Sequence, residues 1–246
     1  MALPVHEHQA AEALLALTAT PHRGEDEGDL LLRLACHAAH VPGVGAVGSS
    51  LTDGSGRPGQ LAGSNDVAVQ LERDQQELQE GPCLDTVRSG RPLTDVPLVH
   101  AHGHIRWPRF TRRALDAGFS AVTTLPLACQ DRVFGALVLY HQHGVLHPDD
   151  VRWSRLLADA AAVGLAHRGV LREARCRSEQ LQSALNSRVV IEQAKGMLAE
   201  RLGCTVADAF DLLRQHARTH RVRIADLSIE IINNPATAGP FPRPPR

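Results

Sequence analysis

The sequence predicts an α+β fold in which a mostly antiparallel sheet is followed by an all-helical C-terminal part. Three observations support this class. Short apolar runs bounded by turn signals alternate with helical periods up to about residue 147. Two adjacent apolar runs, residues 121–127 and 133–140, flank a polar turn and are typical of an antiparallel hairpin. No proline lies between residues 149 and 234, where all apolar spacing is helical.

The N-terminal half is expected to build the sheet domain. Two helical pieces before residue 43 are separated by the polar segment 22–28, and residues 44–51 form a first strand that ends at the turn Thr52-Asp53-Gly54-Ser55-Gly56. The remaining expected elements are a strand at 60–63, a helix at 67–78, a short helix opened by Pro82, an edge strand at 91–95 and a helix at 107–117 stopped by Gly118.

Pro148 opens a long helix that we expect to run for about 30 residues. Its apolar stripe keeps a spacing of three and four residues and comprises Leu156, Ala160, Val163, His167, Val170 and Ala174. One helix cannot bury such a stripe by itself, so a partner helix in a coiled-coil homodimer is the simplest cover.

The last ordered segment is predicted to hold three short helices. Ile191, Ala194, Leu198 and Leu202 form the first stripe, which Gly203 ends. Thr205 caps the second helix, whose expected buried stripe is Val206, Ala209, Phe210, Leu213 and Ala217. The third carries Ile224, Leu227 and Ile231. The tail from residue 236 has four prolines and is expected to be disordered.

Composition excludes several classes of protein. No apolar run is long enough for a membrane helix and no signal peptide is evident, so we expect a cytoplasmic protein with no membrane partner. Five cysteines without a CxxC pair indicate neither a disulfide framework nor a zinc site. We interpret five of the 14 histidines as solvated loop or strand-end residues rather than metal ligands: His100, His102, His104, His141 and His143. No metal and no cofactor is predicted.

The net charge of −1 hides an asymmetry. Residues 1–166 carry 13 Lys and Arg against 19 Asp and Glu, whereas residues 167–233 carry 11 against 8. A polyanionic partner would therefore meet the C-terminal part.

The run Ser187-Arg188-Val189-Val190-Ile191-Glu192-Gln193-Ala194-Lys195-Gly196 resembles the opening of an ANTAR domain, the RNA-binding module of bacterial antitermination regulators. The likeness continues through Leu198, Arg201, Gly203, Ala209-Phe210, Leu213-Arg214, Leu227 and Ile231. It implies binding to paired stem-loops in nascent leader RNA, which prevents a terminator from forming.

The front domain is similar to the GAF domains that precede ANTAR domains in actinobacterial regulators. The likeness is carried by Glu80-Gly81-Pro82-Cys83-Leu84-Asp85, Arg106-Trp107-Pro108, Phe110, Leu125-Pro126-Leu127, Gly135-Ala136-Leu137 and Leu139-Tyr140. It implies a sensory role, with a small-molecule or protein signal. Candidate ligand-binding residues are Cys83, Asp85, Trp107 and Tyr140. The motif by which some GAF domains bind cyclic nucleotides is not recognisable.

Within the ANTAR-like segment, helical spacing places Arg188, Glu192, Lys195 and Ala199 on one face away from the apolar stripe. Arg188 and Lys195 are therefore expected to be exposed, and Gly196 would let an RNA backbone approach closely. Arg214, Arg218 and Arg221 share a face of the second helix, and Arg201 and Thr205 complete the candidate RNA-binding set. Phe210 is expected in the core.

Two other classes of function stay open. Cys83 follows Pro82 at a helix N-terminus, which would lower its thiol pKa and favour redox sensing or a methionine sulfoxide reductase-like activity. Such an enzyme needs a resolving thiol, for which Cys36 and Cys129 are candidates. The helical module could instead bind a protein. Nucleophile-elbow, phosphate-loop and His-Glu-x-x-His motifs are absent from the sequence, so we do not expect an enzyme.

The predicted division of the chain has five parts. These are an N-terminal helical segment at 1–28, a GAF sensory domain at 29–166, a coiled-coil linker helix at 167–186, an ANTAR domain at 187–233 and a tail at 234–246.

Overall fold

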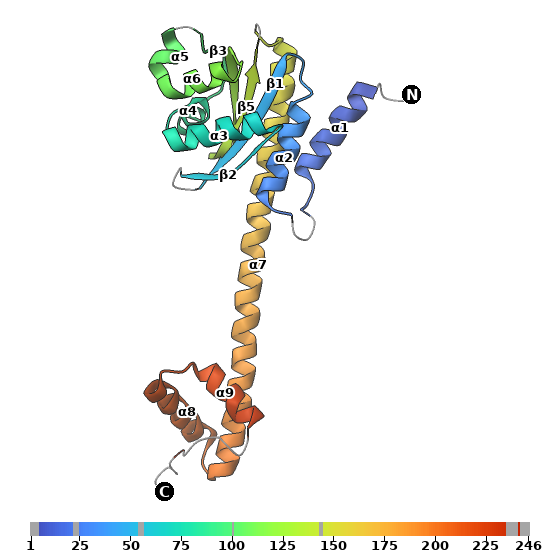
Figure 1. The fold of residues 1–246 in the computed structure, drawn as a ribbon. Helices are drawn as coiled ribbons and strands as arrows, with labels where there is room; N and C mark the ends of the chain where they lie inside the picture. The colour runs from blue at the N-terminus through green and yellow to red at the C-terminus, as the bar shows by residue number, and fades with distance from the viewer. Residues whose placement is uncertain are drawn as a thin grey trace. The chain divides into compact units, whose positions relative to one another are not determined.

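The computed structural model describes residues 5–21, 25–53, 57–99, 101–142, 145–234 and 241, and Figure 1 shows its ribbon. Contacts divide the chain into two compact units, Met1–Val170 and Leu171–Arg246. In chain order the elements are α1 (Val5–Thr18), α2 (Glu27–Ala38), β1 (Val44–Thr52), β2 (Pro58–Gly63), α3 (Asp66–Leu78), α4 (Pro82–Ser89), β3 (Leu93–Pro97), α5 (Ala101–Arg106), α6 (Pro108–Asp116), β4 (Ala121–Cys129), β5 (Arg132–His141), α7 (Pro148–Leu202), α8 (Val206–His220) and α9 (Ile224–Asn233).

The described strands form one sheet in the order β2-β1-β5-β4-β3, and every neighbouring pair is antiparallel. The predicted hairpin is therefore confirmed, since β4 pairs with β5 from Ala121 opposite His141 to Cys129 opposite Arg132. β3 lies at the edge, directly after Pro92. An edge position suits this strand because Pro97 within it has no N–H to donate to a ladder. The α+β class is confirmed.

Helices cover both faces of the sheet. Alternate side chains of each strand point to opposite faces and so pack into two separate clusters. Val47, Leu125, Leu137 and Leu139 pack into one cluster with α1, α2 and the first part of α7. Their neighbours Ala46, Val122, Val138 and Tyr140 pack into a second cluster with α3, α4 and α6. Figure 1 shows the two helical layers on opposite sides of the strands.

Helix α1 belongs to this packed unit. Its residue Leu17 is fully buried. A Cβ on Gly164 of α7 would lie only 2.2 Å from the carbonyl oxygen of Leu17. The two backbones approach closely because Gly164 has no side chain.

The histidine interpretation needs correction. Residues 101–106 form helix α5 instead of a loop. His141 ends β5 fully buried, with its Nε2 3.5 Å from Thr123 Oγ1, so it is a packed residue and not a solvated one. His100 and His143 lie outside the described residues, and the side chains of His102 and His104 are not described either. The expected break at 22–28 ends earlier than predicted, because Asp26 caps α2 and Gly28 lies inside it.

Helix α7 runs from Pro148 to Leu202 without a break, so the expected helix of about 30 residues was too short. It includes the first helix of the C-terminal module, because neither Gly169 nor Gly196 stops a helix and no proline intervenes. In unit 1 the helix buries Leu157, Ala161 and Leu165 against the sheet. Three members of the predicted stripe lie on another face and stay exposed among the described residues: Leu156 is 48% exposed, Val163 49% and Val170 64%.

Unit 2 consists of the end of α7 with α8 and α9. Its core contains Ala194, Leu198, Ala199, Ala209, Leu213, Ala217, Leu227 and Ile231. Gly203 ends α7 with φ +63°, and Thr205 caps α8 through a reciprocal pair of hydrogen bonds with Asp208. Most of the tail predicted to be disordered lies outside the described residues, while Phe241 packs against His216 with ring centroids 4.9 Å apart.

Among the described residues, no helix combines the length and apolar character that crossing a membrane would require.

Gly164→Ala tests the α1–α7 contact. The new methyl group meets the Leu17 carbonyl, so we expect unit 1 to lose about 1 to 3 kcal/mol of stability. Gly169→Ala in the same helix is the matched control, because nothing lies within 4 Å of its Cβ position. That control is expected to gain about 1 kcal/mol through helix propensity. Chemical denaturation of both variants measures the difference, and equal effects would contradict the contact.

Candidate functional site

A buried carboxyl group lies between the sheet and helices α3 and α4. Glu72 is 1% exposed, and its Oε1 accepts a hydrogen bond from the Tyr140 hydroxyl at 2.8 Å. Gln75 Nε2 donates to the same oxygen at 3.2 Å and to Tyr140 Oη at 3.1 Å. The second oxygen, Glu72 Oε2, is buried and has no hydrogen-bond partner among the described residues. The group is thus only half satisfied, which is costly in an apolar interior.

Two glycines make room for this cluster. A Cβ on Gly48 of β1 would lie 2.3 Å from Glu72 Oε1, and a Cβ on Gly81 would lie 2.3 Å from Gln75 Oε1. Gly81 also has φ +144°, a conformation that other residues rarely adopt. Both positions therefore require glycine as long as the cluster keeps its geometry.

Burial raises the pKa of Glu72 to about 7, and the hydrogen bond from Tyr140 opposes this rise only in part. Burial and the neighbouring Glu72 also raise the pKa of the Tyr140 hydroxyl well above its ordinary value. The tyrosine therefore stays a proton donor, while the carboxyl group changes its protonation near neutral pH.

Cys83 contradicts the expectation of an activated thiol. Its side chain is 2% exposed, its Sγ lies 2.9 Å from Ser50 Oγ, and its backbone N–H donates to Gln75 Oε1 at 2.8 Å. Burial, together with the nearby Glu72 carboxylate, raises the pKa of this thiol far above its usual value. Desolvation thus outweighs any benefit from the start of α4, and the premise of a reactive Cys83 thiolate was wrong.

Asp85 and Trp107 contact each other. The Trp107 indole Nε1 donates to Asp85 Oδ2 at 3.0 Å, and Arg106 Nε donates to the same oxygen at 2.7 Å. Trp107 is 1% exposed and packs edge-on against Phe110. This carboxylate therefore anchors the start of α6 to α4.

The structure brings Cys83, Trp107 and Tyr140 into one buried cluster, with Asp85 at its border. Their role in binding a ligand stays a prediction. Sequence reasoning missed Glu72 and Gln75 at the centre of the site. Helical spacing in the sequence could have identified both residues as buried, because Glu72 lies four residues after Ala68 and Gln75 lies four residues after Leu71.

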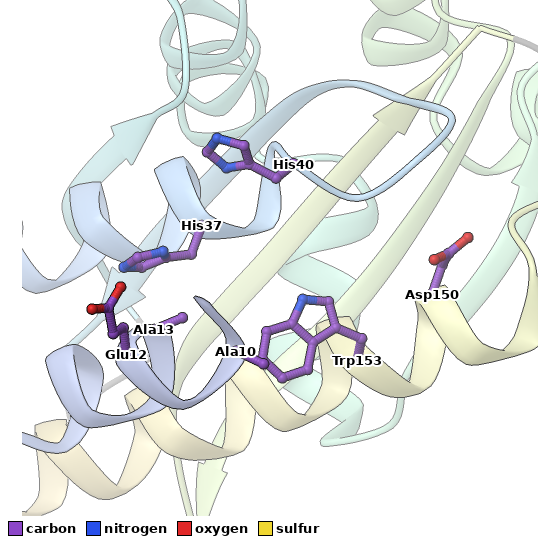
Figure 2. A pocket seen from close by; sticks show the side chains of 7 residues that line it. All are labelled: Ala10, Glu12, Ala13, His37, His40, Asp150 and Trp153. Atoms are coloured by element: carbon purple, nitrogen blue, oxygen red, sulfur yellow. The ribbon is translucent and has the colours of Figure 1, made fainter. Parts of the chain in front are cut away.

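A hollow lies on the other side of the sheet from the Glu72 cluster, between α1, α2 and α7 (Figure 2). It has a volume of about 530 Å³ and is lined by Ala10, Glu12, Ala13, His37, His40, Asp150 and Trp153. Burial, with His40 and Arg33 nearby, lowers the pKa of His37, so its imidazole is neutral at pH 7. The described residues contain no group of three or more His, Cys, Asp or Glu arranged to hold a metal ion.

In unit 2, Lys195 is held instead of freely exposed, contrary to our expectation. Its side chain is 16% exposed, its Nζ lies 2.9 Å from Glu192 Oε2, and the same nitrogen lies 4.9 Å from the centroid of the Phe210 ring. Ala199, predicted on the same solvent face, is 9% exposed and packs in the core. The face we assigned to RNA is thus narrower than the helical spacing suggested.

Phe210 corrects a second expectation, because its ring is only partly buried and lies outside the core of unit 2. The buried stripe of α8 is Ala209, Leu213 and Ala217, which repeats every four residues. Phe210 stands about 100° around the helix from that stripe. Val206, also predicted in the stripe, is 49% exposed.

The other candidate RNA contacts lie at the surface of unit 2. Arg188, Gly196, Arg201, Thr205, Arg214 and Arg218 are all exposed. Nothing lies within 4 Å of a Cβ position on Gly196. Thr205 serves as the cap of α8, so its hydroxyl is already engaged with Asp208. Their contact with RNA stays a prediction.

Glu72→Gln tests the buried carboxyl group. Glutamine keeps an acceptor for Tyr140 but cannot ionise. In the wild type the folded-state pKa of about 7 exceeds the unfolded value of 4.5, so stability falls as pH rises between these values. We expect the variant to gain stability over the wild type across that range, by at most about 3 kcal/mol above pH 7.

Urea unfolding from pH 5 to pH 8 measures this gain. The exposed Glu77→Gln on the same helix is the matched control. A pH-dependent gain of equal size in the control would contradict the assignment to Glu72.

Comparison with known proteins identifies both parts of the chain. A GAF domain model matches residues 25–166, and an ANTAR domain model matches residues 179–232. No curated protein matches the chain.

Among solved structures, the GAF domain of an Acinetobacter phosphoenolpyruvate-protein phosphotransferase is 13% identical, with a TM-score of 0.49, and covers 69% of this chain and 97% of its own. The reduced form of fRMsr of Staphylococcus aureus is 15% identical, with a TM-score of 0.46 and coverages of 67% and 99%. The GAF-B domain of DevS from Mycobacterium smegmatis is 16% identical, with a TM-score of 0.43 and coverages of 61% and 99%.

All three TM-scores lie below 0.5, so the assignment depends on the family models and not on these likenesses. The GAF match covers more than half of the 246 residues and coincides with the sheet domain of unit 1. The ANTAR match falls on the helices of unit 2. The chain therefore belongs to the GAF domain family and carries an ANTAR domain after its GAF domain.

Proposed function

We propose that the chain is a transcription antitermination regulator of the actinobacterial GAF–ANTAR type, which binds paired stem-loops in nascent RNA. The ANTAR match over residues 179–232 carries this proposal. The GAF domain would sense a small-molecule or protein signal, and the protein would act in the cytoplasm, where nascent RNA is made.

The charges of unit 2 support an RNA partner. Arg214 and Arg218 are four residues apart and so share one face of α8, while Arg221 caps the end of that helix. None of these three side chains forms a hydrogen bond or ion pair with a described residue. Unpaired cations are available to neutralise phosphates, and the release of counterions then drives binding.

The exposed stripe of α7 supports a homodimer. Leu156, Val163 and Val170 are seven residues apart and are each about half exposed or more. A second copy of the helix would cover them by coiled-coil packing. A dimer presents two ANTAR domains, so a target with two stem-loops is bound with an avidity that one domain lacks.

The direct test of RNA binding is an electrophoretic shift of the full chain with a tandem stem-loop RNA, and with a single stem-loop for comparison. We expect tighter binding to the tandem RNA and an affinity that falls steeply with salt. Absence of any shift at low salt would contradict the proposal and favour a protein-interaction module.

Lys195→Ala is expected to weaken RNA binding and to reduce the slope of log affinity against log salt by about 0.7 to 0.9 for each phosphate that the variant no longer neutralises. Arg177→Ala is the matched control, because Arg177 is also ion-paired on α7, with Glu173. Filter-binding titrations between low and physiological salt measure both quantities. An unchanged affinity and slope in Lys195→Ala would remove this residue from the interface.

Val163→Glu is expected to convert the dimer to a monomer, because it places a charge on the stripe. Val145→Glu is the control, since Val145 is exposed outside this helix. Light scattering coupled to size-exclusion chromatography gives the mass of each. A monomeric wild type would refute the dimer.

A further inference from the structure

We propose that a groove beside Phe210 holds one unpaired base of an RNA loop, stacked on the phenylalanine ring. The proposal depends on the proposed RNA-binding function and names the part of the RNA that this surface recognises. The groove, called here the Phe210 groove, has a volume of about 420 Å³ and lies between α8 and the start of α9.

The apolar part of the groove is formed by Phe210, Ala217, Val222 and Ile224. Val222 is 45% exposed, and the Phe210 ring is only partly buried although the core of unit 2 lies directly beside it. A partly exposed aromatic ring beside apolar side chains suits the face of a nucleobase, because every base presents an aromatic face and can stack whatever its identity.

The charged part of the groove is formed by Arg214, Arg218 and Arg221, and none of the described residues that line it is acidic. Lys195 Nζ lies over the Phe210 ring, 4.9 Å from its centroid, and adds a fourth cation, although Glu192 balances it. Lys195 does not line the groove, so the base would stack on the ring face that Lys195 leaves open. An aromatic surface surrounded by cations matches a nucleotide, whose base stacks while its flanking phosphates meet the positive charges.

This arrangement favours a loop nucleotide over a base-paired one. In a stem both faces of each base are covered by its neighbours, and the major groove of A-form RNA is too deep and narrow for side chains to read. An unpaired loop base can leave the stack and expose one face. The stem-loop target of the proposed function contains such bases.

Arg221 is fixed by backbone geometry. It caps α8 with φ +54°, and its N–H donates to the carbonyl oxygens of Ala217 and Arg218. Its side chain therefore leaves the helix where the backbone turns toward α9, next to the apolar part of the groove.

The test compares Phe210→Leu with Phe210→Tyr in the full chain, using a tandem stem-loop RNA. Leucine keeps most of the apolar volume but has no aromatic face, so we expect roughly tenfold weaker binding with an unchanged salt slope. Tyrosine keeps the face and is expected to bind like the wild type. Arg218→Ala should instead lower the salt slope, because it removes a charge and no stacking surface.

The RNA side of the test replaces the loop nucleotides one at a time by abasic sites. An abasic site at one loop position should weaken binding of the wild type about as much as Phe210→Leu weakens binding of intact RNA. Binding of this abasic RNA by the Phe210→Leu variant should be no weaker than with either change alone. If Phe210→Leu does not fold, 2-aminopurine placed at that position reports stacking in the wild type through quenched fluorescence.

The outcomes separate the two proposals. A wild-type chain that binds no stem-loop RNA overturns the proposed function and the groove with it. RNA binding that is equally strong in Phe210→Leu, or a 2-aminopurine signal that no loop position quenches, overturns the Phe210 groove alone. Equal weakening by Phe210→Leu and Phe210→Tyr also overturns it, because the ring would then serve packing and not stacking.

Discussion

The alternation of side chains along β1, β4 and β5 is the constraint on which unit 1 depends. Because both faces of the sheet are covered by helices, each strand must carry apolar side chains at odd and even positions alike. A shift of one residue in register would exchange the two faces and move the Tyr140 hydroxyl away from Glu72 to the side that packs against α2 and α7. The antiparallel ladder of β4 and β5 therefore determines where the polar cluster lies.

That cluster lowers the stability of unit 1. A half-satisfied carboxyl group in the interior lowers stability, and an apolar side chain at position 72 would avoid the cost. Its presence links α3 to β5 through the Tyr140 hydroxyl and to α4 through Gln75 and the Cys83 amide. Hydrogen bonds are directional, so they specify how these helices sit on the sheet more narrowly than apolar contacts do.

Much of the fold followed from periodicity in the sequence, and the failures have physical causes. Residues 121–141 were readable as a hairpin because two apolar runs flank a polar turn. The continuity of α7 past residue 187 was missed because the apolar residues of the helix move to a different face there. In the sequence such a move resembles the end of a helix, although the helix continues. Cys83 was misjudged because its burial, which depends on contacts with β1 and α3, outweighs the local effect of a helix N-terminus. Phe210 was wrongly assigned to the core because the buried residues of α8 repeat every four positions from Ala209, which leaves the residue next to Ala209 outside the core.

The cysteines of this chain provide a built-in set of chemical reporters. Cys36 and Cys176 are exposed, on α2 and α7, and should react promptly with a thiol reagent. Cys83 is shielded by the sheet and α4 and holds its proton tightly, so a reagent reaches it only when that layer opens. Cys129 and Cys204 are partly buried, so the free energy of local opening around the polar cluster is measured by the slow phase of labelling in a variant that keeps only Cys83. A signal molecule that binds at the polar cluster and stiffens the layer of helices over it would slow the labelling of Cys83. Labelling would thus detect the signal even while its chemical identity is unknown.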